Sequence, residues 1–96
     1  MAYRFSWDHR KAAINRRRHG VRFDEASTVF DDPLAIIFDD DPHSSYEERD
    51  LIIGHSISGR LLFVSFTERP GGILHLISAR PVTQKERRDY EENLHA

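Results

Sequence analysis

Residues 51–80 read LIIGHSISGRLLFVSFTERPGGILHLISAR and contain three apolar segments separated by two turns. The segments 51–57, 60–67 and 73–79 are rich in Leu, Ile, Val and Phe, as β-strands are. A two-residue hairpin turn is predicted at Ser58-Gly59, where glycine supplies the positive φ, and a second turn at residues 69–72. This stretch therefore predicts three consecutive antiparallel strands at the centre of the fold.

The residues before this stretch predict two helices and two further strands. Asp8 is a suitable N-cap and Gly20 a suitable C-terminal stop for a first helix. A second helix is expected over residues 23–30, before Asp32-Pro33, because the residue before a proline avoids the helical region. Residues 3–7 alternate like a short strand, and residues 34–38 form an apolar strand segment.

A charged helix is expected at the C-terminal end, because Thr83 and Glu86 form a capping box after Pro81. Helices are thus segregated from strands, which predicts an α+β fold. We expect two N-terminal helices packed on an antiparallel sheet of about four strands, plus the C-terminal helix, within one domain that spans residues 1–96.

The composition narrows the class of protein. The chain has 96 residues, of which 39% are hydrophobic and 31% charged, and this is the balance of a small globular domain. It has no cysteine, which excludes disulfides, thiolate metal sites and cysteine nucleophiles. It contains no apolar run long enough to span a bilayer and no signal-peptide pattern, so a cytoplasmic protein is expected.

The net charge of −2 hides a strongly uneven distribution. Residues 31–50 hold eight Asp or Glu and a single cation, Arg49. Residues 10–22 hold no acid, so a polyanion suits this segment and a basic partner suits the acidic one. The cations of residues 10–22 are Arg10, Lys11, Arg16, Arg17, Arg18 and Arg22.

An ordered set of residues along the chain resembles the BrnT family of bacterial ribonuclease toxins. The match spans roughly residues 5–90, and no single motif in it is specific. It consists of Phe5-Ser6-Trp7-Asp8, Lys11, Asn15, His19-Gly20-Val21, Phe23, Glu25-Ala26, Val29-Phe30, Asp32-Pro33, Glu47-Glu48-Arg49, Gly54, Arg60, Ile77-Ser78-Ala79-Arg80, Glu86-Arg87 and Tyr90.

The resemblance implies a RelE-like ribonuclease fold and inhibition of bacterial growth by RNA cleavage. It also implies a partner, a BrnA-type antitoxin with its own DNA-binding domain, in a hetero-oligomer, with a homodimer as a further option. No cofactor is implied. One departure is His75, which stands where the family usually carries an arginine and could weaken RNA binding or add a titrating group.

Metal-independent RNA cleavage needs a base, an acid and cations that stabilise the phosphate. With the predicted turns, His55 pairs with Leu62 and Arg60 with Arg80, so that His55, Arg60, Ser78 and Arg80 share one face of the sheet. We therefore assign His55, Arg60 and Arg80 as candidate catalytic residues.

The alternative for this group is structural. Arg60 and Arg80 then pair with acids such as Glu48 or Glu86, and His55 is a half-buried strand histidine. His75 is expected on the face opposite His55, beside Ser65 and Thr67 and under a helix.

The first helix offers a second group. Lys11, Asn15 and His19 are spaced i, i+4, i+8 and share one face, with Arg18 beside them. They form either an RNA-facing stripe or a structural set in which Asn15 and His19 bond to nearby backbone. We assign Lys11, Arg17, Arg18, His19 and Arg49 as candidate substrate-binding residues, whereas Phe5 and Trp7 are expected in the core.

Two functions remain open at this stage. The first is an endoribonuclease toxin, and the second is a non-catalytic RNA- or protein-binding module, or an inactive toxin remnant, that uses the same basic face. No metal site is expected, because the run Asp39-Asp40-Asp41 lacks ligand spacing and successive loop acids are usually solvated.

Overall fold

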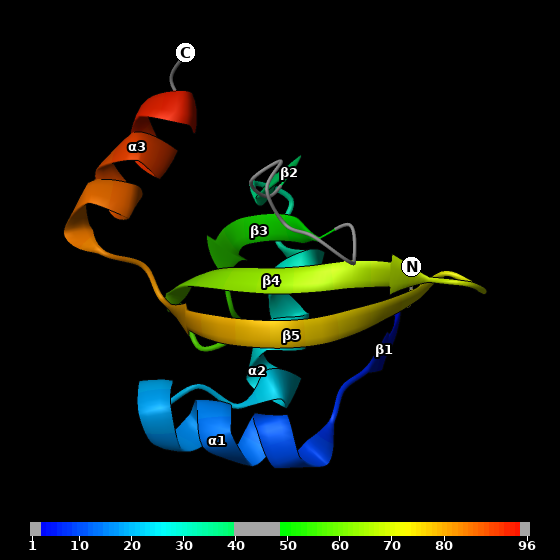
Figure 1. Ribbon diagram of the computed structural model, residues 1–96. Helices are drawn as coiled ribbons and strands as arrows, with labels where there is room; N and C mark the ends of the chain where they lie inside the picture. Colours follow the sequence, from blue (N-terminus) through cyan, green and yellow to red (C-terminus); the bar gives the residue numbers. More distant parts are fainter. Residues whose placement is uncertain (1–2, 40–48, 95–96) are drawn as a thin grey trace.

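The computed structural model describes residues 3–39 and 49–94, which form three α-helices, a short 3-10 helix and five strands (Figure 1). The α+β prediction is confirmed. The elements in chain order are β1 (Arg4–Ser6), α1 (His9–His19), α2 (Phe23–Ser27), the 3-10 helix η1 (Thr28–Asp31), β2 (Ile36–Asp39), β3 (Asp50–His55), β4 (Leu61–Arg69), β5 (Ile73–Pro81) and α3 (Gln84–Leu94).

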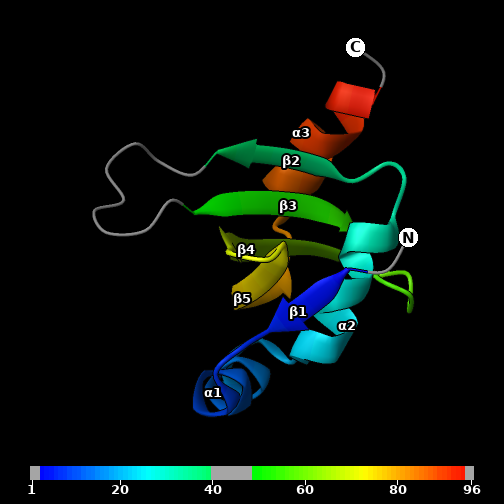
Figure 2. The ribbon, with the colours of Figure 1, turned by 90° about the vertical axis from the view of Figure 1, so that its right-hand side faces the viewer.

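The five strands form one mixed sheet in the order β1-β5-β4-β3-β2 (Figure 2). Strands β2 to β5 are antiparallel neighbours, but β1 pairs in parallel with the first residues of β5. The predicted sheet of about four antiparallel strands was therefore one strand short. Parallel pairing needs a long connection, and nothing local in residues 3–7 indicates a partner so far along the chain.

The predicted start and end of α1 and the predicted start of α3 are confirmed by the backbone, whereas the helix predicted over residues 23–30 is divided into α2 and η1. The carboxylate of Asp8 accepts a hydrogen bond from the N–H of Lys11 at 3.0 Å, and Gly20 ends α1 with φ 70°. At the start of α3, the N–H of Glu86 donates to Thr83 Oγ1 at 3.1 Å and the N–H of Thr83 donates to Glu86 Oε1 at 2.8 Å, which is the predicted capping box.

One face of the sheet, here called the covered face, packs against α2, η1 and the segment after α1. Its core is apolar, and Phe5 and Trp7 pack against it as predicted. The ring centroids of Trp7 and Phe23 lie 5.9 Å apart. The buried residues of this core are Val21, Phe23, Ala26, Val29, Phe30, Ile52, Leu62, Val64, Phe66, Leu74, Leu76 and Ala79.

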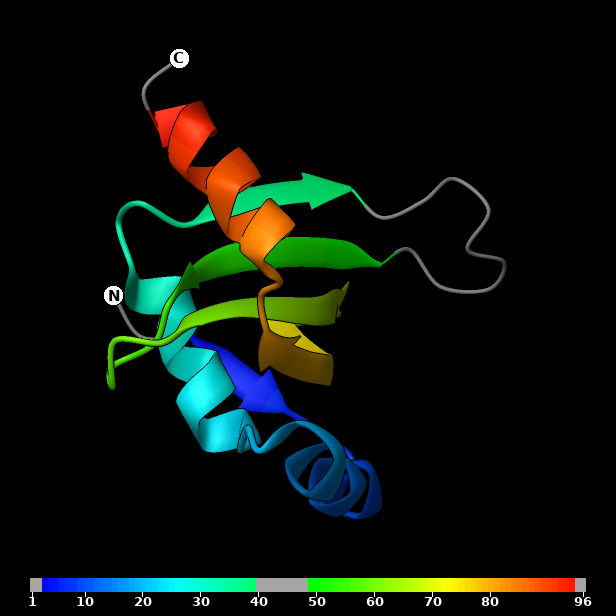
Figure 3. The same cartoon turned by 90° about the vertical axis from the view of Figure 1, so that its left-hand side faces the viewer.

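The other face, here called the open face, carries Phe63, Ser65, Ser78 and Arg80. Helix α3 crosses this face at the β2–β3 side only (Figure 3). There Tyr90 is buried with Ile53 and Leu61, and Phe63 packs against the same cluster. Helix α1 lies along the free edge of β5, beyond the point where the short strand β1 ends (Figure 1).

The first hairpin differs from its prediction by one residue. The N–H of Ser56 donates to the carbonyl oxygen of Arg60 at 2.8 Å, so the loop is the three residues 57–59 instead of the two residues 58–59. His55 consequently pairs with Leu61 and not with Leu62. Three-residue loops that end in a left-handed glycine are a common hairpin type, and Gly59 has φ 84°.

The strands β4 and β5 contain a β-bulge. Ser65 pairs with Ser78, but Phe66 pairs with Leu76, which leaves Ile77 as an additional residue in β5. The bulge reverses the faces of all β5 residues after it relative to the predicted register.

The two one-residue differences cancel for some residues and not for others. His55, Ser78 and Arg80 lie on the same face, as predicted. Each pairs with an odd-numbered residue of β4, and these partners are Leu61, Ser65 and Phe63. Arg60 lies on the covered face, so the predicted four-residue group was wrong in that member. His75 pairs with Thr67 on the open face, so its predicted position opposite His55 was also wrong.

Candidate nucleic-acid interface

Helix α1 presents a dense basic surface. Its last turn contains Arg16, Arg17, Arg18 and His19, and its first turn contains no acid. The arginine side chains are exposed, and in the part of the chain that the structure describes no acidic side chain pairs with Lys11 or with these arginines.

A pocket of about 170 Å3 lies between α1 and β5, and we call it the α1–β5 pocket. The predicted helix face is confirmed here, since the side chains at positions 11, 15 and 19 all line this one pocket. Arg17 does not line it. The lining residues are Lys11, Ile14, Asn15, Arg18, His19, Ile77 and Ser78.

Asn15 is the structural member of this group, as the alternative interpretation predicted for it. Its amide Nδ2 donates to the carbonyl oxygens of Ala79 at 2.8 Å and of Val21 at 3.0 Å, and its Oδ1 accepts from the N–H of Ala79 at 3.1 Å. Only 6% of Asn15 is exposed. Asn15 therefore anchors α1 to the edge of β5 and leaves Lys11, Arg18 and His19 to face solvent.

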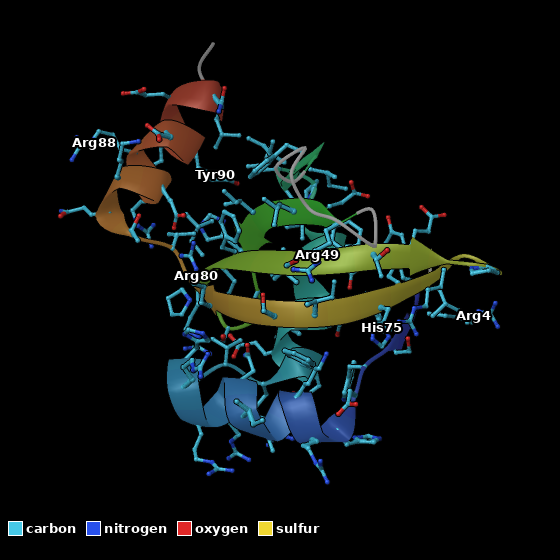
Figure 4. The ribbon with its side chains drawn as sticks, viewed as in Figure 1. Arg4, Arg49, His75, Arg80, Arg88 and Tyr90 are labelled. Atoms are coloured by element: carbon cyan, nitrogen blue, oxygen red, sulfur yellow. The ribbon has the colours of Figure 1, made fainter. Side chains whose placement is uncertain are left out.

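Arg80 lies at one end of the open face, where β5 leads into α3 (Figure 4). Its Nη1 and Nη2 donate to Glu86 Oε1 and Oε2, each at 2.8 Å, and its guanidinium carbon lies 4.5 Å from the centroid of the Phe63 ring. The hydrogen bond from Arg80 lowers the pKa of Glu86 to about 2, and the same bond raises the pKa of Arg80. The predicted alternative, in which Arg80 pairs with Glu86, is thus confirmed as a contact.

The contact with Glu86 leaves some of the N–H groups of Arg80 available for a ligand. A guanidinium has five N–H groups, and Arg80 uses three of them, two on Glu86 and one on the carbonyl oxygen of Pro81 at 3.3 Å. The Nε–H and one Nη2–H have no acceptor among the described residues. These two groups form the side of the fork that can bind a phosphate through two parallel hydrogen bonds.

His55 ends β3 on the same face as Arg80. Its Nδ1 lies 3.5 Å from Asp32 Oδ2, and its backbone N–H donates to the same oxygen at 2.7 Å. Burial raises the pKa of Asp32, but the hydrogen bonds from the N–H groups of His55 and Leu34 outweigh it, and the pKa lies below its ordinary value. The His55 ring also packs edge-on against Tyr90, with centroids 6.0 Å apart.

Arg60 has a different environment. Its guanidinium donates to both carboxylate oxygens of Glu25 in α2 and to the carbonyl oxygen of Gly20. Ser56 and Ser58 donate to the same carboxylate. The Arg60 hydrogen bond lowers the pKa of Glu25 to about 2. This network ties the first hairpin to the helices on the covered face, and it separates Arg60 from His55 and Arg80.

Arg49 and His75 lie near the open face of the sheet. Arg49 is exposed and lies in front of β4, and His75 lies at the other end of β5, near β1 (Figure 4). The Nδ1 of His75 is 2.8 Å from the hydroxyl of Ser6, whose strand is the parallel neighbour of β5. Of its two predicted neighbours, Thr67 is confirmed as the cross-strand partner of His75, whereas Ser65 pairs with Ser78.

Within residues 3–39 and 49–94 no three His, Asp or Glu side chains gather closely enough to hold a metal ion. Asp40, Asp41 and Glu48 lie outside the described residues, so the metal and pairing hypotheses for them stay untested.

Sequence reasoning missed two acids that matter. Glu25 is the partner of Arg60 at a separation of 35 residues, and Asp32 is the partner of His55 at a separation of 23. In the sequence, Asp32-Pro33 indicates a helix stop and belongs to the set of residues that resembles the BrnT family, but neither feature predicts a partner for Asp32. A β-strand histidine and a distant acid share no periodic pattern, so only the packing of η1 against β3 reveals the contact.

The site thus belongs to a small α+β protein whose exposed cations gather along one edge of a sheet and at one end of its open face, an arrangement suited to a polyanion. The profile of the family "Ribonuclease toxin, BrnT, of type II toxin-antitoxin system" matches residues 7–86. The chain belongs to this BrnT family of ribonuclease toxins. Membership implies an RNA substrate and a cognate antitoxin.

The fold agrees with this assignment. The crystal structure of the Brucella abortus ribonuclease toxin BrnT superposes with a TM-score of 0.66 at 22% sequence identity, covering 86% of this chain and 100% of that one. No curated protein sequence matches the chain significantly. None of the helices in residues 3–39 and 49–94 has the length and apolarity that a membrane-spanning helix requires.

Proposed function

We propose that this ribonuclease toxin is a metal-independent endoribonuclease that binds single-stranded RNA along the edge of β5 and across the open face. The observation that carries the proposal is the way in which the guanidinium of Arg80 is held. Glu86 and Phe63 hold its guanidinium in place, while the Nε–H and one Nη2–H stay available on a side chain that is 35% exposed. A guanidinium fixed in this way can bind phosphate without first losing its side-chain entropy.

His55 is the proposed proton-transfer residue. It shares the open face with Arg80, its side chain is 44% exposed, and Asp32 lies 3.5 Å from its Nδ1, so Nε2 is the ring nitrogen proposed for proton transfer. A carboxylate at one ring nitrogen orients a histidine for proton transfer at the other.

The reaction needs no water in its first step. The base removes the proton of the ribose 2′-hydroxyl, the O2′ attacks phosphorus, and the bond from phosphorus to O5′ breaks. A proton is delivered to the departing O5′, which gives a 2′,3′-cyclic phosphate and a 5′-hydroxyl. Arg80 stabilises the negative charge on the phosphate as the bonds change.

The cations of α1 and Arg49 are the proposed substrate-binding residues. Helix α1, which carries Lys11, Arg17, Arg18 and His19, contacts β5, and Arg49 lies in front of β4 (Figure 4). Arg60 is not part of this set, because its guanidinium is committed to Glu25 and Gly20 on the other face.

Cleavage of a generic single-stranded RNA in the presence of EDTA tests the proposal. We expect activity that survives the chelator, products with 2′,3′-cyclic phosphate ends, and loss of about 100-fold or more in Arg80→Ala and in His55→Ala. Binding of RNA without any cleavage would instead identify a non-catalytic binding module. Full activity in His55→Ala with loss in His19→Ala would move proton transfer to the α1–β5 pocket.

The cognate partner is proposed to be a BrnA-type antitoxin that forms a hetero-oligomer with the toxin in the bacterial cytoplasm and restores growth. We expect it to cover the basic surface. Hydrogen exchange of the complex against the free toxin measures this, and a complex in which Lys11, Arg17 and Arg80 all stay exposed would contradict it.

A further inference from the structure

The α1–β5 pocket differs from the neighbouring pockets in its charge. It is lined by Lys11, Arg18 and His19 and by no acid. The pocket beside His55 contains Asp31 and Asp32, and the pocket under α3 contains Glu86 and Asp89, with no Lys or Arg in either. The pocket at the start of α1 contains Arg16 and Arg22, but it also contains the carboxylate of Asp24, which pairs with Arg22 at 3.1 Å. An anionic ligand therefore meets attraction without an opposing carboxylate at the α1–β5 pocket.

The walls of this pocket are fixed from two sides. Asn15 at its base is held by three hydrogen bonds to the backbone, two of them to Ala79. On the β5 side, the bulge at Ile77 places two consecutive residues, Ile77 and Ser78, in the lining. Bulges of this kind redirect side chains and are frequent beside functional sites. The cations consequently project from a rigid base.

The pocket also has an apolar side. Ile14 is 45% exposed on α1, next to Ile77 of β5. The volume of the pocket is about 170 Å3, well above what a single water molecule needs. A phosphate group has five heavy atoms and fits this space, with the attached nucleoside left to lie on Ile14.

We infer that the α1–β5 pocket is a nucleotide subsite for the RNA chain, in which Lys11 and Arg18 bind a backbone phosphate and Ile14 contacts the adjoining nucleoside. This inference rests on the proposed function and names one place where the substrate is held. Ser78, whose side chain is exposed, offers a hydroxyl to the same phosphate. The subsite recognises the RNA backbone and is separate from the group of Arg80 and His55.

The direct test uses a short single-stranded RNA in which every ribose is 2′-O-methylated, so that attack by the 2′-oxygen is blocked. The wild-type toxin carries 13C-labelled isoleucine methyl groups and is titrated with this probe by NMR. We expect saturable shifts of the Ile14 and Ile77 signals. The Ile37 signal, which reports an exposed position on the edge strand β2, serves as the internal control and stays unchanged. Binding of the probe with no shift at Ile14 and Ile77 would overturn the inference.

Substitutions provide a second, independent arm, read as probe affinity by fluorescence anisotropy. Lys11→Ala and Arg18→Ala are expected to weaken binding about fivefold or more and to reduce the slope of log affinity against log salt by about 0.7 each. Ile14→Ala is expected to weaken binding without changing the slope. Arg16→Ala removes the same charge from the same helix outside the pocket and is expected to have less than half the effect. Equal effects of all three cation variants would show diffuse attraction and no subsite.

Failure of the subsite and failure of the proposed function are distinguishable. Cleavage that is lost in Arg80→Ala, with no methyl shifts at the pocket, removes the subsite alone. Methyl shifts at the pocket, with RNA that is never cleaved, remove the catalytic proposal and leave the subsite in place.

Discussion

Asn15 takes the place of a strand partner for Ala79. Its carboxamide both accepts from the N–H and donates to the C=O of that residue, at 3.1 and 2.8 Å. Strand β1 pairs with β5 only as far as His75, so the edge beyond it would otherwise be unpaired. One side chain of a helix thereby satisfies the edge of a sheet and fixes the helix on it.

Replacing Asn15 is expected to destabilise the fold. Asn15→Ala leaves the buried N–H of Ala79 without an acceptor, which costs about 2–3 kcal/mol. Urea unfolding followed by circular dichroism measures this. The exposed neighbour Arg16→Ala is the control and is expected to change stability by less than about 0.5 kcal/mol. An Asn15→Ala protein as stable as this control would contradict the role given to the carboxamide.

Arg60 is expected to act through stability. Glu25 is only 18% exposed, and Arg60 is the cation that compensates its charge, so Arg60→Ala should lower the free energy of unfolding by about 2 kcal/mol. The double variant Arg60→Ala/Glu25→Gln should lower it by much less than the sum of the two single variants. The exposed pair of Arg22 and Asp24 is the control, and Arg22→Ala should cost less than about 0.5 kcal/mol.

The same variant also tests the original catalytic assignment of Arg60. RNA cleavage per folded molecule should fall no further in Arg60→Ala than the folded fraction does. A loss of 100-fold or more in fully folded protein would return Arg60 to the catalytic group.

Acid should unfold the protein through two carboxylates. The pKa values of Glu25 and Glu86 are lowered from 4.5 to about 2 in the folded protein, so the unfolded chain binds more protons between these values. Their stabilisation is therefore complete above about pH 4.5 and is lost as the pH falls toward 2. We expect about 1–2 kcal/mol from each, after allowance for the solvent exposure of the arginines. Urea midpoints measured across this range should depend less on pH in Glu25→Gln/Glu86→Gln, and an unchanged dependence would contradict the assignment.

Gly54 is expected to tolerate no side chain. A Cβ at this position would lie 2.8 Å from Ala35 Cβ, 3.0 Å from Val29 Cγ1 and 3.1 Å from Asp32 Oδ2. Gly54→Ala should therefore cost about 1–3 kcal/mol by overpacking. Thermal unfolding measures the loss, and Gly72→Ala provides the contrast, since there only the positive φ of 73° opposes the substitution and no atom lies within 4 Å.

The sequence predicted the elements well and the faces of the strands poorly. Helix ends and the capping box depend on local hydrogen bonds, so Asp8, Gly20, Thr83 and Glu86 indicate them directly. Faces depend on the loop length at residues 57–59 and on the bulge at Ile77, and a difference of one residue reverses a whole strand.

The candidate site was predictable in part, because some of its residues lie on one helix whereas the others depend on the register of the strands. Lys11, Arg18 and His19 come from one helix, whose period of 3.6 residues brings them to one face without further information. His55 and Arg80 kept their common face because two errors of one residue cancelled, whereas Arg60, affected by only one of them, did not. The pairing of Arg60 with Glu25 depends on tertiary packing and leaves no local signal.

The pairing of residues 4–6 with residues 73–75 has a consequence for synthesis on the ribosome. The N-terminal strand and Asn15 both find their partners in β5, which is made long after them. Until β5 has emerged, α1 has no edge to attach to, and the α1–β5 pocket has only one of its two walls. A nascent chain of this toxin therefore cannot assemble the proposed RNA-binding edge until most of its own translation is complete.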